Sequence, residues 1–128
     1  MSRHVKKPEI MEVIKVFQTF DPVLFSWEKP VPFKIGLADQ IVKAAPNLRA
    51  ALIRQAFRLL CRRSSYLAAC VKAGTPRYGL NGKQDGEITP EQALYALRTL
   101  KKRKSPYYLS MLEKGLVSDP DTEDNKLA

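Results

Sequence analysis

Three arginines spaced four residues apart, Arg54, Arg58 and Arg62, are the side chains of this sequence best suited to hold a charged ligand. Residues at this spacing lie along one face of a helix, so their guanidinium groups form a positive ridge. Adjacent like charges on such a face repel by roughly 0.2–0.5 kcal/mol per pair. The interval between Asp39 and Asp85 holds nine Lys and Arg and no acidic residue, so the nearby sequence offers no carboxylate to relieve this repulsion. The pattern predicts a polyanion as the partner, such as the phosphate backbone of a nucleic acid.

Two further residues extend this set along the chain. Tyr66 lies one helical turn past Arg62, where it can stack on a base or hydrogen-bond a phosphate, and Arg77 stands at the foot of a turn. A basic groove beside an aromatic ring is the arrangement that grips a single-stranded end. Taken singly, an arginine is usually solvated and a tyrosine usually belongs to the core, so the interpretation depends on their combination.

The composition favours a binding protein over an enzyme. The 128 residues carry a net charge of +9, which favours nucleic acid or an anionic membrane surface as the partner. The single histidine is His4, near the N-terminus, and the carboxylates avoid the basic middle of the chain. We therefore expect no catalytic set, no cofactor, no metal and no small-molecule substrate. Cys61 and Cys70 match neither a zinc nor a redox motif, and we expect both to be small buried hydrophobic residues.

The distribution of apolar and charged residues also predicts the cellular location and the division into domains. No apolar run approaches the ~20 residues of a membrane span, and the N-terminus lacks the apolar stretch of a secretion signal. We expect a monomeric cytoplasmic protein that does not contact a membrane. A single domain is predicted over residues 8–117, with a flexible N-terminus at 1–7 and a disordered acidic tail at 118–128.

Apolar spacing predicts three helices in the first half of the chain. The first is expected over residues 8–20, followed by an irregular connector that is packed by its aromatic residues. The second is expected over 34–44, and the third over 48–62 with Asn47 as its N-cap. On the third helix an apolar arc lies opposite the arginine ridge, so burial of the arc leaves the ridge exposed. The arc comprises Leu48, Leu52, Ile53, Ala56, Leu59 and Leu60.

Turn signals predict a hairpin in the second half. A short helix is expected to start at Ser64 or Ser65 and to end with Gly74 in the left-handed conformation. Asn81-Gly82 is a strong signal for a hairpin turn, with strands expected near 77–80 and 84–88.

Two more helices are predicted after the hairpin. Thr89-Pro90-Glu91-Gln92 is a capping box with proline at the first helical position, which begins a helix that continues toward Lys104. The basic cluster at 101–104 complements the dipole of that helix and is placed to touch a nucleic acid as well. A last helix is expected over 107–116. These elements predict a mainly α domain of the α+β class, compact, with a small β-hairpin.

Five short motifs along the chain resemble those of the ProQ/FinO family of bacterial RNA-binding domains, in the same order and spacing. They are Lys34-Ile35-Gly36, the stretch 48–52 that leads into Arg54 and Arg58, Ser65-Tyr66-Leu67, Lys72-Ala73-Gly74 and residues 77–82. The resemblance spans roughly residues 9–104. It implies a mainly helical domain that acts as an RNA chaperone for small regulatory RNAs and messenger 3′ ends, recognising the base of a terminator stem and the 3′ uridine tail.

Carried over by position, the resemblance assigns two groups of residues. The basic face of the family falls on Lys34, Arg54, Arg58 and Arg62, and suits a duplex that exposes only phosphates and 2′-hydroxyls. The pocket for the 3′ end falls on Tyr66 and Arg77, with Lys72, Gly74 and Thr75 close by. Relatives often carry a further basic residue one turn before Arg54, where this chain has Ala50.

Two other functions are compatible with the sequence. Short helices around Ser64 are compatible with a helix-turn-helix module for double-stranded DNA, although the segment after Ser65 offers few side chains that read base edges. Alternatively, the charge serves only solubility in an interaction protein. Competition between RNA and duplex DNA, and retention of nucleic acid at low salt, separate these possibilities.

Overall fold

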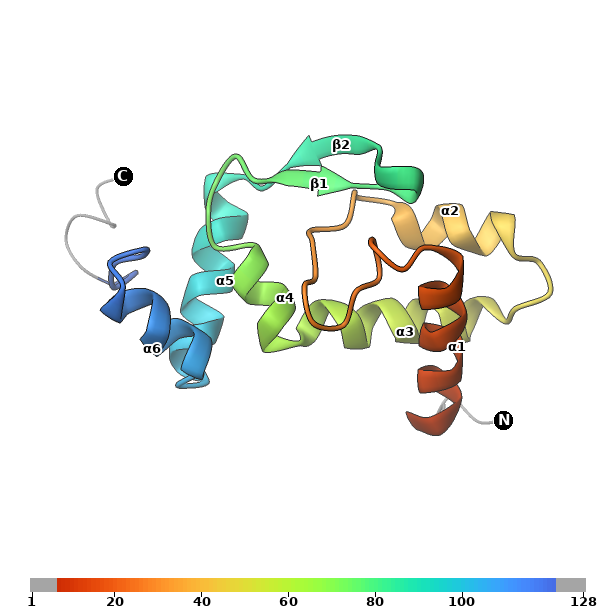
Figure 1. The fold of residues 1–128 in the computed structure, drawn as a ribbon, viewed down its shortest axis with the longest axis horizontal. Helices are drawn as coiled ribbons and strands as arrows, with labels where there is room; N and C mark the ends of the chain where they lie inside the picture. The colour runs from red at the N-terminus through yellow and green to blue at the C-terminus, as the bar shows by residue number, and fades with distance from the viewer. Residues whose placement is uncertain (1–6, 122–128) are drawn as a thin grey trace.

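The computed structural model describes residues 7–121, which form six α-helices and one two-stranded antiparallel sheet. Figure 1 shows α1 (Lys7–Phe20), α2 (Leu37–Ala44) and α3 (Ala50–Arg62) grouped at one end. At the other end lie α5 (Pro90–Lys102) and α6 (Pro106–Glu113), with the short α4 (Ser64–Ala69) between the two groups. The predicted fold class is confirmed. No helix within the described range is long and apolar enough to cross a membrane.

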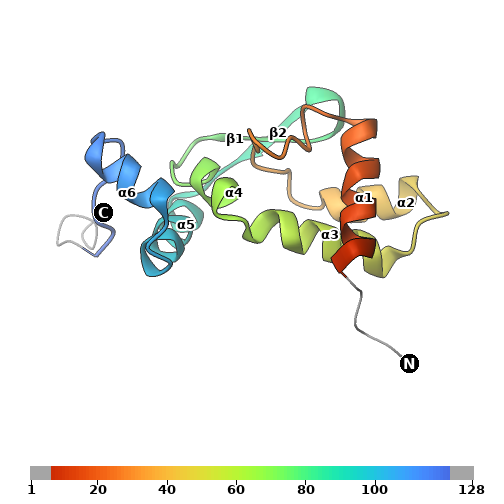
Figure 2. The ribbon, with the colours of Figure 1, turned by 60° about the horizontal axis from the view of Figure 1, so that its bottom comes forward.

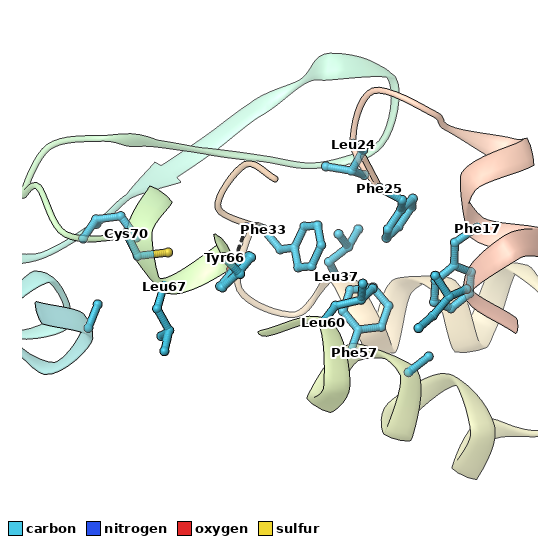
Figure 3. Close-up of a cluster of buried hydrophobic side chains, with 14 of the residues drawn as sticks. Phe17, Leu24, Phe25, Phe33, Leu37, Phe57, Leu60, Tyr66, Leu67 and Cys70 are labelled. Carbon is cyan, nitrogen blue, oxygen red and sulfur yellow. Dashed lines mark hydrogen bonds between the residues drawn. The ribbon is translucent and has the colours of Figure 1, made fainter. Parts of the chain in front are cut away.

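A chain of aromatic rings forms the centre of the core. Phe17, Phe25, Phe33, Phe57 and Tyr66 are buried, and successive ring centroids lie 5.0–5.9 Å apart. Figure 3 shows these rings running from α1, across the connector, to α3 and α4. Rings at such separations in tilted and edge-on arrangements add stability beyond the apolar area that they bury. The core therefore fixes α4, and with it Tyr66, against the connector.

The connector between α1 and α2 has no regular structure, as its prolines predict. Its Trp27 lies under the guanidinium of Arg63, whose Cζ is 3.4 Å from the ring centroid. The same guanidinium donates a hydrogen bond of 2.9 Å to the Trp27 carbonyl. This cation–π contact fastens the connector to the junction of α3 and α4.

The predicted hairpin is confirmed and packs on the connector. It consists of β1 (Pro76–Tyr78) and β2 (Gln84–Glu87), joined through a 3₁₀ turn at Leu80–Gly82. Asn81 and Gly82 have φ angles of 62° and 73°, the left-handed conformation that this residue pair adopts readily. Phe33 of the connector forms a parallel bridge to Tyr78, and the hairpin runs above α4 and α3 in the turned view of Figure 2.

The capping box of α5 is formed as predicted. The Thr89 hydroxyl accepts a hydrogen bond of 3.1 Å from the Gln92 amide, and the Gln92 side-chain oxygen accepts one of 2.9 Å from the Thr89 amide. Such a reciprocal pair satisfies two amides that have no partner within the helix. The start of α5 is thereby fixed close to the hairpin.

Several predicted boundaries are wrong. The second helix begins at Leu37 instead of residue 34, and α4 ends at Ala69, before the expected Gly74. Asn47 does not cap α3, because Arg49 occupies the N-cap position and its side chain makes no capping hydrogen bond. The Leu48 amide donates a hydrogen bond to the Ala45 carbonyl, so residues 45–48 form a turn and Asn47 lies within it. Local cap preference is outweighed here by the short connection between α2 and α3.

The acidic segment expected to be a disordered tail begins within the described residues. Lys101 of α5 contacts carboxylate oxygens of Asp119 and Asp121 at 2.7 and 2.6 Å, and Pro120 between them is buried. Residues 118–121 are therefore packed along α5. The remainder of the predicted tail, like residues 1–6 of the predicted flexible N-terminus, lies outside the described range.

Candidate nucleic-acid interface

The arginine ridge lies on the exposed face of α3. Arg54, Arg58 and Arg62 are all exposed, whereas the opposite side of the helix is buried. The buried residues of α3 are Ile53, Ala56, Phe57 and Leu60. Leu48, Leu52 and Leu59 of the predicted arc are half-buried, and Phe57 belongs to the buried side although the predicted arc omits it. Apolar burial thus orients the ridge toward solvent, as the helical period predicts.

One member of the ridge has a carboxylate partner that the sequence did not suggest. The Arg54 guanidinium contacts Asp39 of α2 at 2.7 Å, with both side chains at least half exposed. An exposed pair of this kind contributes little stability, so a phosphate can compete for Arg54. Neither Arg58 nor Arg62 forms an ion pair within residues 7–121, and these two are the open charges of the ridge.

Lys34 lies at the hairpin. Its ammonium is 3.6 Å from a carboxylate oxygen of Asp85, and its side chain crosses Gly79. A Cβ at Gly79 would lie 2.9 Å from Lys34 Cδ, so a larger residue there would push the lysine away. The lysine is 25% exposed and lines the same hollow as Arg77.

The guanidinium of Arg77 joins three segments of the chain. It donates hydrogen bonds of 2.7 Å to the Phe33 carbonyl and 2.9 Å to the Gln92 side-chain oxygen. Because that oxygen also closes the capping box with Thr89, Arg77 is positioned by the start of α5. The Nε of Arg77 is buried and has no hydrogen-bond partner within the described residues. A buried donor without a partner is costly, so this Nε is a point where the fold tolerates an unsatisfied polar group.

Tyr66 is buried beside Arg77, with 7% of its surface exposed. Its hydroxyl accepts a hydrogen bond of 3.0 Å from the Phe33 amide, and its ring packs against Phe33 with centroids 5.1 Å apart (Figure 3). Burial raises the pKa of Tyr66, so the hydroxyl keeps its proton at neutral pH. The ring therefore offers little face for stacking, and the remaining capacity of Tyr66 is donation from its hydroxyl.

Two hollows flank Tyr66 and Arg77. One, of about 330 Å³, lies between α3 and residues 33–39. The other, of about 390 Å³, lies between α4 and α5 and ends at Tyr95. Tyr66, Arg77 and Cys61 line both hollows. Neither Arg58 nor Arg62 lines these hollows; Arg58 lies about 60° around the axis of α3 from Cys61, which does line them.

The two cysteines of the hollow are free thiols. Burial raises the pKa of the Cys61 thiol and raises that of Cys70 to about 11. Both therefore remain protonated at neutral pH and contribute apolar surface. Cys70 is buried as predicted, whereas Cys61 is half-buried because it lines both hollows.

The loop before β1 lies apart from both hollows. The Gly74 amide donates to the Ile88 carbonyl at 2.8 Å, and the Thr75 amide and hydroxyl both donate to the Lys72 carbonyl. None of Lys72, Gly74 and Thr75 lines either hollow. The donors of Gly74 and Thr75 are used within the fold, whereas the Lys72 side chain is exposed. Of the predicted pocket residues, Tyr66 and Arg77 line the same hollows.

Several residues of the interface were not anticipated. Gln92 and the Phe33 carbonyl hold Arg77, and Tyr95 closes one hollow. The capping box gave a local signal for Gln92, but nothing in the sequence links it to Arg77, 15 residues earlier. Across residues 7–121 no group of three His, Cys, Asp or Glu side chains is placed to hold a metal ion.

The fold and the interface together define a small helical domain with an exposed arginine ridge on α3 and a double hollow at Tyr66 and Arg77. The chain belongs to the ProQ/FinO family, whose family model matches residues 8–110. This finding confirms the resemblance seen in the five motifs.

Two groups of relatives support the assignment. The chain is 32% identical over 110 residues to the RNA chaperone ProQ of Haemophilus ducreyi, covering 83% of this chain and 60% of that protein. It is 27% identical over 106 residues to a fertility inhibition protein of Escherichia coli, covering 80% of this chain and 56% of that protein. The chain thus spans less than two thirds of the length of these relatives.

Solved structures agree with the family. A FinO-like RNA chaperone from Neisseria meningitidis matches with a TM-score of 0.62 and 27% identity, over 80% of this chain and 98% of that one. A ProQ homologue from Legionella pneumophila matches with a TM-score of 0.61 and 26% identity, over 81% of this chain and 89% of that one.

Proposed function

We propose that this protein is a cytoplasmic RNA chaperone, and that it binds small regulatory RNAs and messenger 3′ ends at the base of a terminator stem and the single-stranded 3′ uridine tail. Residues 8–117 form the RNA-binding domain and act as a monomer. The names of the relatives support the RNA chaperone activity. The observation that carries the finer proposal is the guanidinium of Arg77, held between two hollows at the edge of an open arginine ridge.

The ridge is assigned to the stem. A-form RNA hides its bases in a deep and narrow major groove, so a protein holds the duplex by its phosphates and 2′-hydroxyls. Arg58 and Arg62, one turn apart and free of ion pairs within the described chain, suit two phosphates along one strand. Arg54 joins them when a phosphate displaces Asp39, and Lys34 contributes from the hairpin side.

The double hollow is assigned to the tail. Arg77 Nε is a donor without a partner within the described residues, and the Tyr66 hydroxyl keeps its proton beside the Cys61 and Cys70 thiols, with which it hydrogen-bonds. Two donors in a sheltered hollow suit the terminal ribose or phosphate of a strand. Of the two roles that its position in the sequence suggests, base stacking and hydrogen bonding, hydrogen bonding is the one that suits the buried Tyr66. Gly74 and Thr75 act by fixing the loop before Arg77, and Lys72 adds an exposed positive charge on that loop.

The structure offers less support for a helix-turn-helix module. A recognition helix needs a row of exposed side chains that reach base edges in the major groove. The candidate helix, α4, is six residues long and buries Ser65, Tyr66 and Leu67. Such a helix has too little exposed surface to read DNA.

The proposal is tested with one RNA hairpin in four forms, measured by fluorescence anisotropy against the intact protein. The forms are a uridine tail ending in a 3′-hydroxyl, the same tail ending in a 3′-phosphate, no tail, and the corresponding DNA hairpin. We expect the first form to bind most tightly. Equal affinity for tailed and tailless RNA contradicts the pocket assignment, and equal or tighter binding of DNA favours the alternative.

Two substitutions separate the contribution of the stem to affinity from that of the tail. Arg58→Ala should weaken binding to every RNA form, because it removes a stem contact. Tyr66→Phe should weaken only the tailed forms, because it removes one donor and keeps the ring in the core. Lys114→Ala, which removes an exposed charge beyond α6, serves as the control for net charge.

A further inference from the structure

Trp27 is a partly exposed aromatic residue of the connector, close to one end of the arginine ridge. It is the one tryptophan of the sequence, and 37% of its surface is exposed. The guanidinium of Arg63 covers one face of its ring, and Arg63 directly follows Arg62, the last residue of the ridge. Figure 1 shows the connector passing the junction of α3 and α4, which Arg63 occupies. The indole therefore lies within the reach of one arginine side chain from the end of the ridge.

The indole is held in place on one side and accessible on another. The cation–π stack at 3.4 Å and the hydrogen bond of 2.9 Å from Arg63 to the Trp27 carbonyl fix the ring and the backbone together. Trp27 also lines a hollow of about 260 Å³, which Arg63 does not line. The other residues that line this hollow are Gln18, Pro22, Phe25, Ser26 and Glu28. A flat ligand can thus reach the indole from the hollow without displacing Arg63.

The charges around the indole favour a base over a phosphate in this hollow. Glu28 is the one charged residue among those that line it, and its exposed carboxylate repels a phosphate. Arg62 and Arg63 do not line the hollow, and they place positive charge along the approach to it from the ridge. An aromatic ring beside such cations binds the bases of a single strand with little sequence preference, because every base has a π face.

The 5′ strand of the proposed stem has no assigned contact beyond the base of the stem. The double hollow assigned to the 3′ tail reaches Cys61 in the last turn of α3, so the base of the stem lies at the Arg62 end of the ridge. The two strands part there, and in a messenger 3′ end the 5′ strand continues into the rest of the message. Trp27 lines neither part of the double hollow. It is therefore accessible to the 5′ strand while the tail occupies the double hollow.

We propose that Trp27 is a stacking platform for an unpaired base on the 5′ side of the stem, with Arg63 holding the ring in place. This inference rests on the proposed function and adds to it a contact for the strand that does not end in the protein. The double hollow binds the end of the transcript, and Trp27 binds the segment that precedes the stem. A transcript with an unpaired segment before its terminator should therefore bind more tightly than a bare hairpin.

The test uses four RNAs that share one hairpin with a uridine tail. The first has no 5′ extension, and the second has several unpaired adenosines 5′ of the stem. The third has the same extension without its bases, and the fourth carries the extra adenosines in its apical loop, so that both match the phosphate count of the second. The wild type should bind the second RNA more tightly than the other three.

Substitution of Trp27 should remove this gain. Trp27→Ala should weaken the complex with the second RNA about 5- to 150-fold, the range expected when one stacked base is lost. It should leave the complex with the first RNA unchanged, which also shows that the variant is folded. Trp27→Phe, which keeps a ring, should retain part of the gain. Phe20→Ala is the matched control, because Phe20 is 69% exposed at the end of α1 and lines none of these hollows.

The fluorescence of Trp27 gives a direct readout in the unaltered protein, because the sequence contains no other tryptophan. Stacking of a base on an indole quenches its emission. The second RNA should therefore quench the emission more strongly than the third, which has the same phosphates and no bases in its extension.

The outcomes separate this inference from the function on which it rests. If the second RNA binds equally well after its uridine tail is removed, both proposals are wrong. If binding requires the tail but the wild type binds the first and second RNAs equally, only the platform is wrong. An equal gain from the third or the fourth RNA, or the same loss with Phe20→Ala, also overturns the platform.

Discussion

The two basic regions of this molecule differ in how many of their charged side chains have partners within residues 7–121. The run Lys101-Lys102-Arg103-Lys104 at the end of α5 is the denser one in the sequence, yet the fold uses much of its charge internally. Lys101 is held by two aspartates, and Arg103 donates to the Arg62 carbonyl at 2.7 Å and to Ser64 at 3.2 Å. On α3 the charges are spread over three turns, but two of them are open. We therefore propose that available charge, and not charge density along the sequence, identifies α3 as the RNA-binding face.

The difference has a structural cause. The end of α5 lies against α4 and α6, where the returning chain brings Asp119 and Asp121 to Lys101 (Figure 1). On α3, by contrast, Asp39 of α2 provides the one carboxylate that pairs with a ridge arginine within residues 7–121. We call the group of Lys101, Asp119 and Asp121 the C-terminal clamp. The following substitutions test this contrast, beginning with the largest expected effect.

Arg77 lies between the two regions, and its removal should damage both binding and stability. Arg77→Ala leaves the Phe33 carbonyl and the Gln92 oxygen without their donor, which should lower the free energy of unfolding by roughly 1.5–3 kcal/mol. Urea unfolding measures this loss, and the tailed hairpin should bind at least ten times more weakly at a concentration where the variant is folded.

Arg77→Lys is the matched control for charge. It keeps the positive charge but cannot donate two hydrogen bonds from one rigid fork. We expect it to remain nearly as weak a binder as the alanine variant. Full recovery by lysine would mean that Arg77 acts only through its charge.

Loss of the C-terminal clamp should loosen the chain without changing RNA affinity. In Lys101→Met the two aspartates lose their shared partner, so the amides of residues 114–121 should exchange their hydrogens faster. Hydrogen–deuterium exchange measures this change segment by segment. A loss of RNA affinity greater than twofold would show that Lys101 belongs to the binding face.

The C-terminal clamp also has a defined pH range. Hydrogen bonds to Lys101 lower the pKa values of Asp119 and Asp121 below the ordinary 3.8 and raise the pKa of Lys101 above 10.5. The carboxylates contribute stability above their unfolded-state pKa, and this contribution is lost as the pH falls through the folded value. The lysine contribution is lost only as the pH rises through its own raised value. The protection that the clamp gives residues 114–121 should therefore be constant between pH 5 and 9, and Lys101→Met should reduce the acid-induced loosening below about pH 4, leaving the Arg98–Asp121 pair.

Removing the carboxylate that pairs with Arg54 should have the smallest effect on RNA affinity. Asp39→Asn removes the carboxylate that pairs with Arg54 and should tighten hairpin binding about two- to fivefold at low salt, with a stability change within about 1 kcal/mol. Glu113→Gln changes the net charge equally on exposed α6 and should have a smaller effect on affinity. Equal gains from both variants would indicate that net charge alone controls binding.

Local features of the fold could be predicted from the sequence, and contacts between distant segments could not. The capping box of Thr89 and Gln92, the Asn81-Gly82 turn and the exposure of the α3 ridge each depend on residues a few positions apart. The partners of Arg77 are 44 and 15 residues away, and Lys101 meets residues 18 and 20 positions later. The burial of Tyr66 could not be predicted from nearby residues either, because it depends on Phe33, 33 residues earlier.

The salt dependence of RNA binding tests the central contrast most directly. Each phosphate contact contributes about 0.7–0.9 to the slope of log K against log salt, so Arg58→Ala/Arg62→Ala should lower the slope for a tailed hairpin by about 1.4–1.8. Arg98→Gln/Lys101→Gln removes the same charge from α5 and should leave the slope unchanged. An unchanged slope in the α3 variant, or an equal decrease in both, would contradict the assignment of the stem to α3.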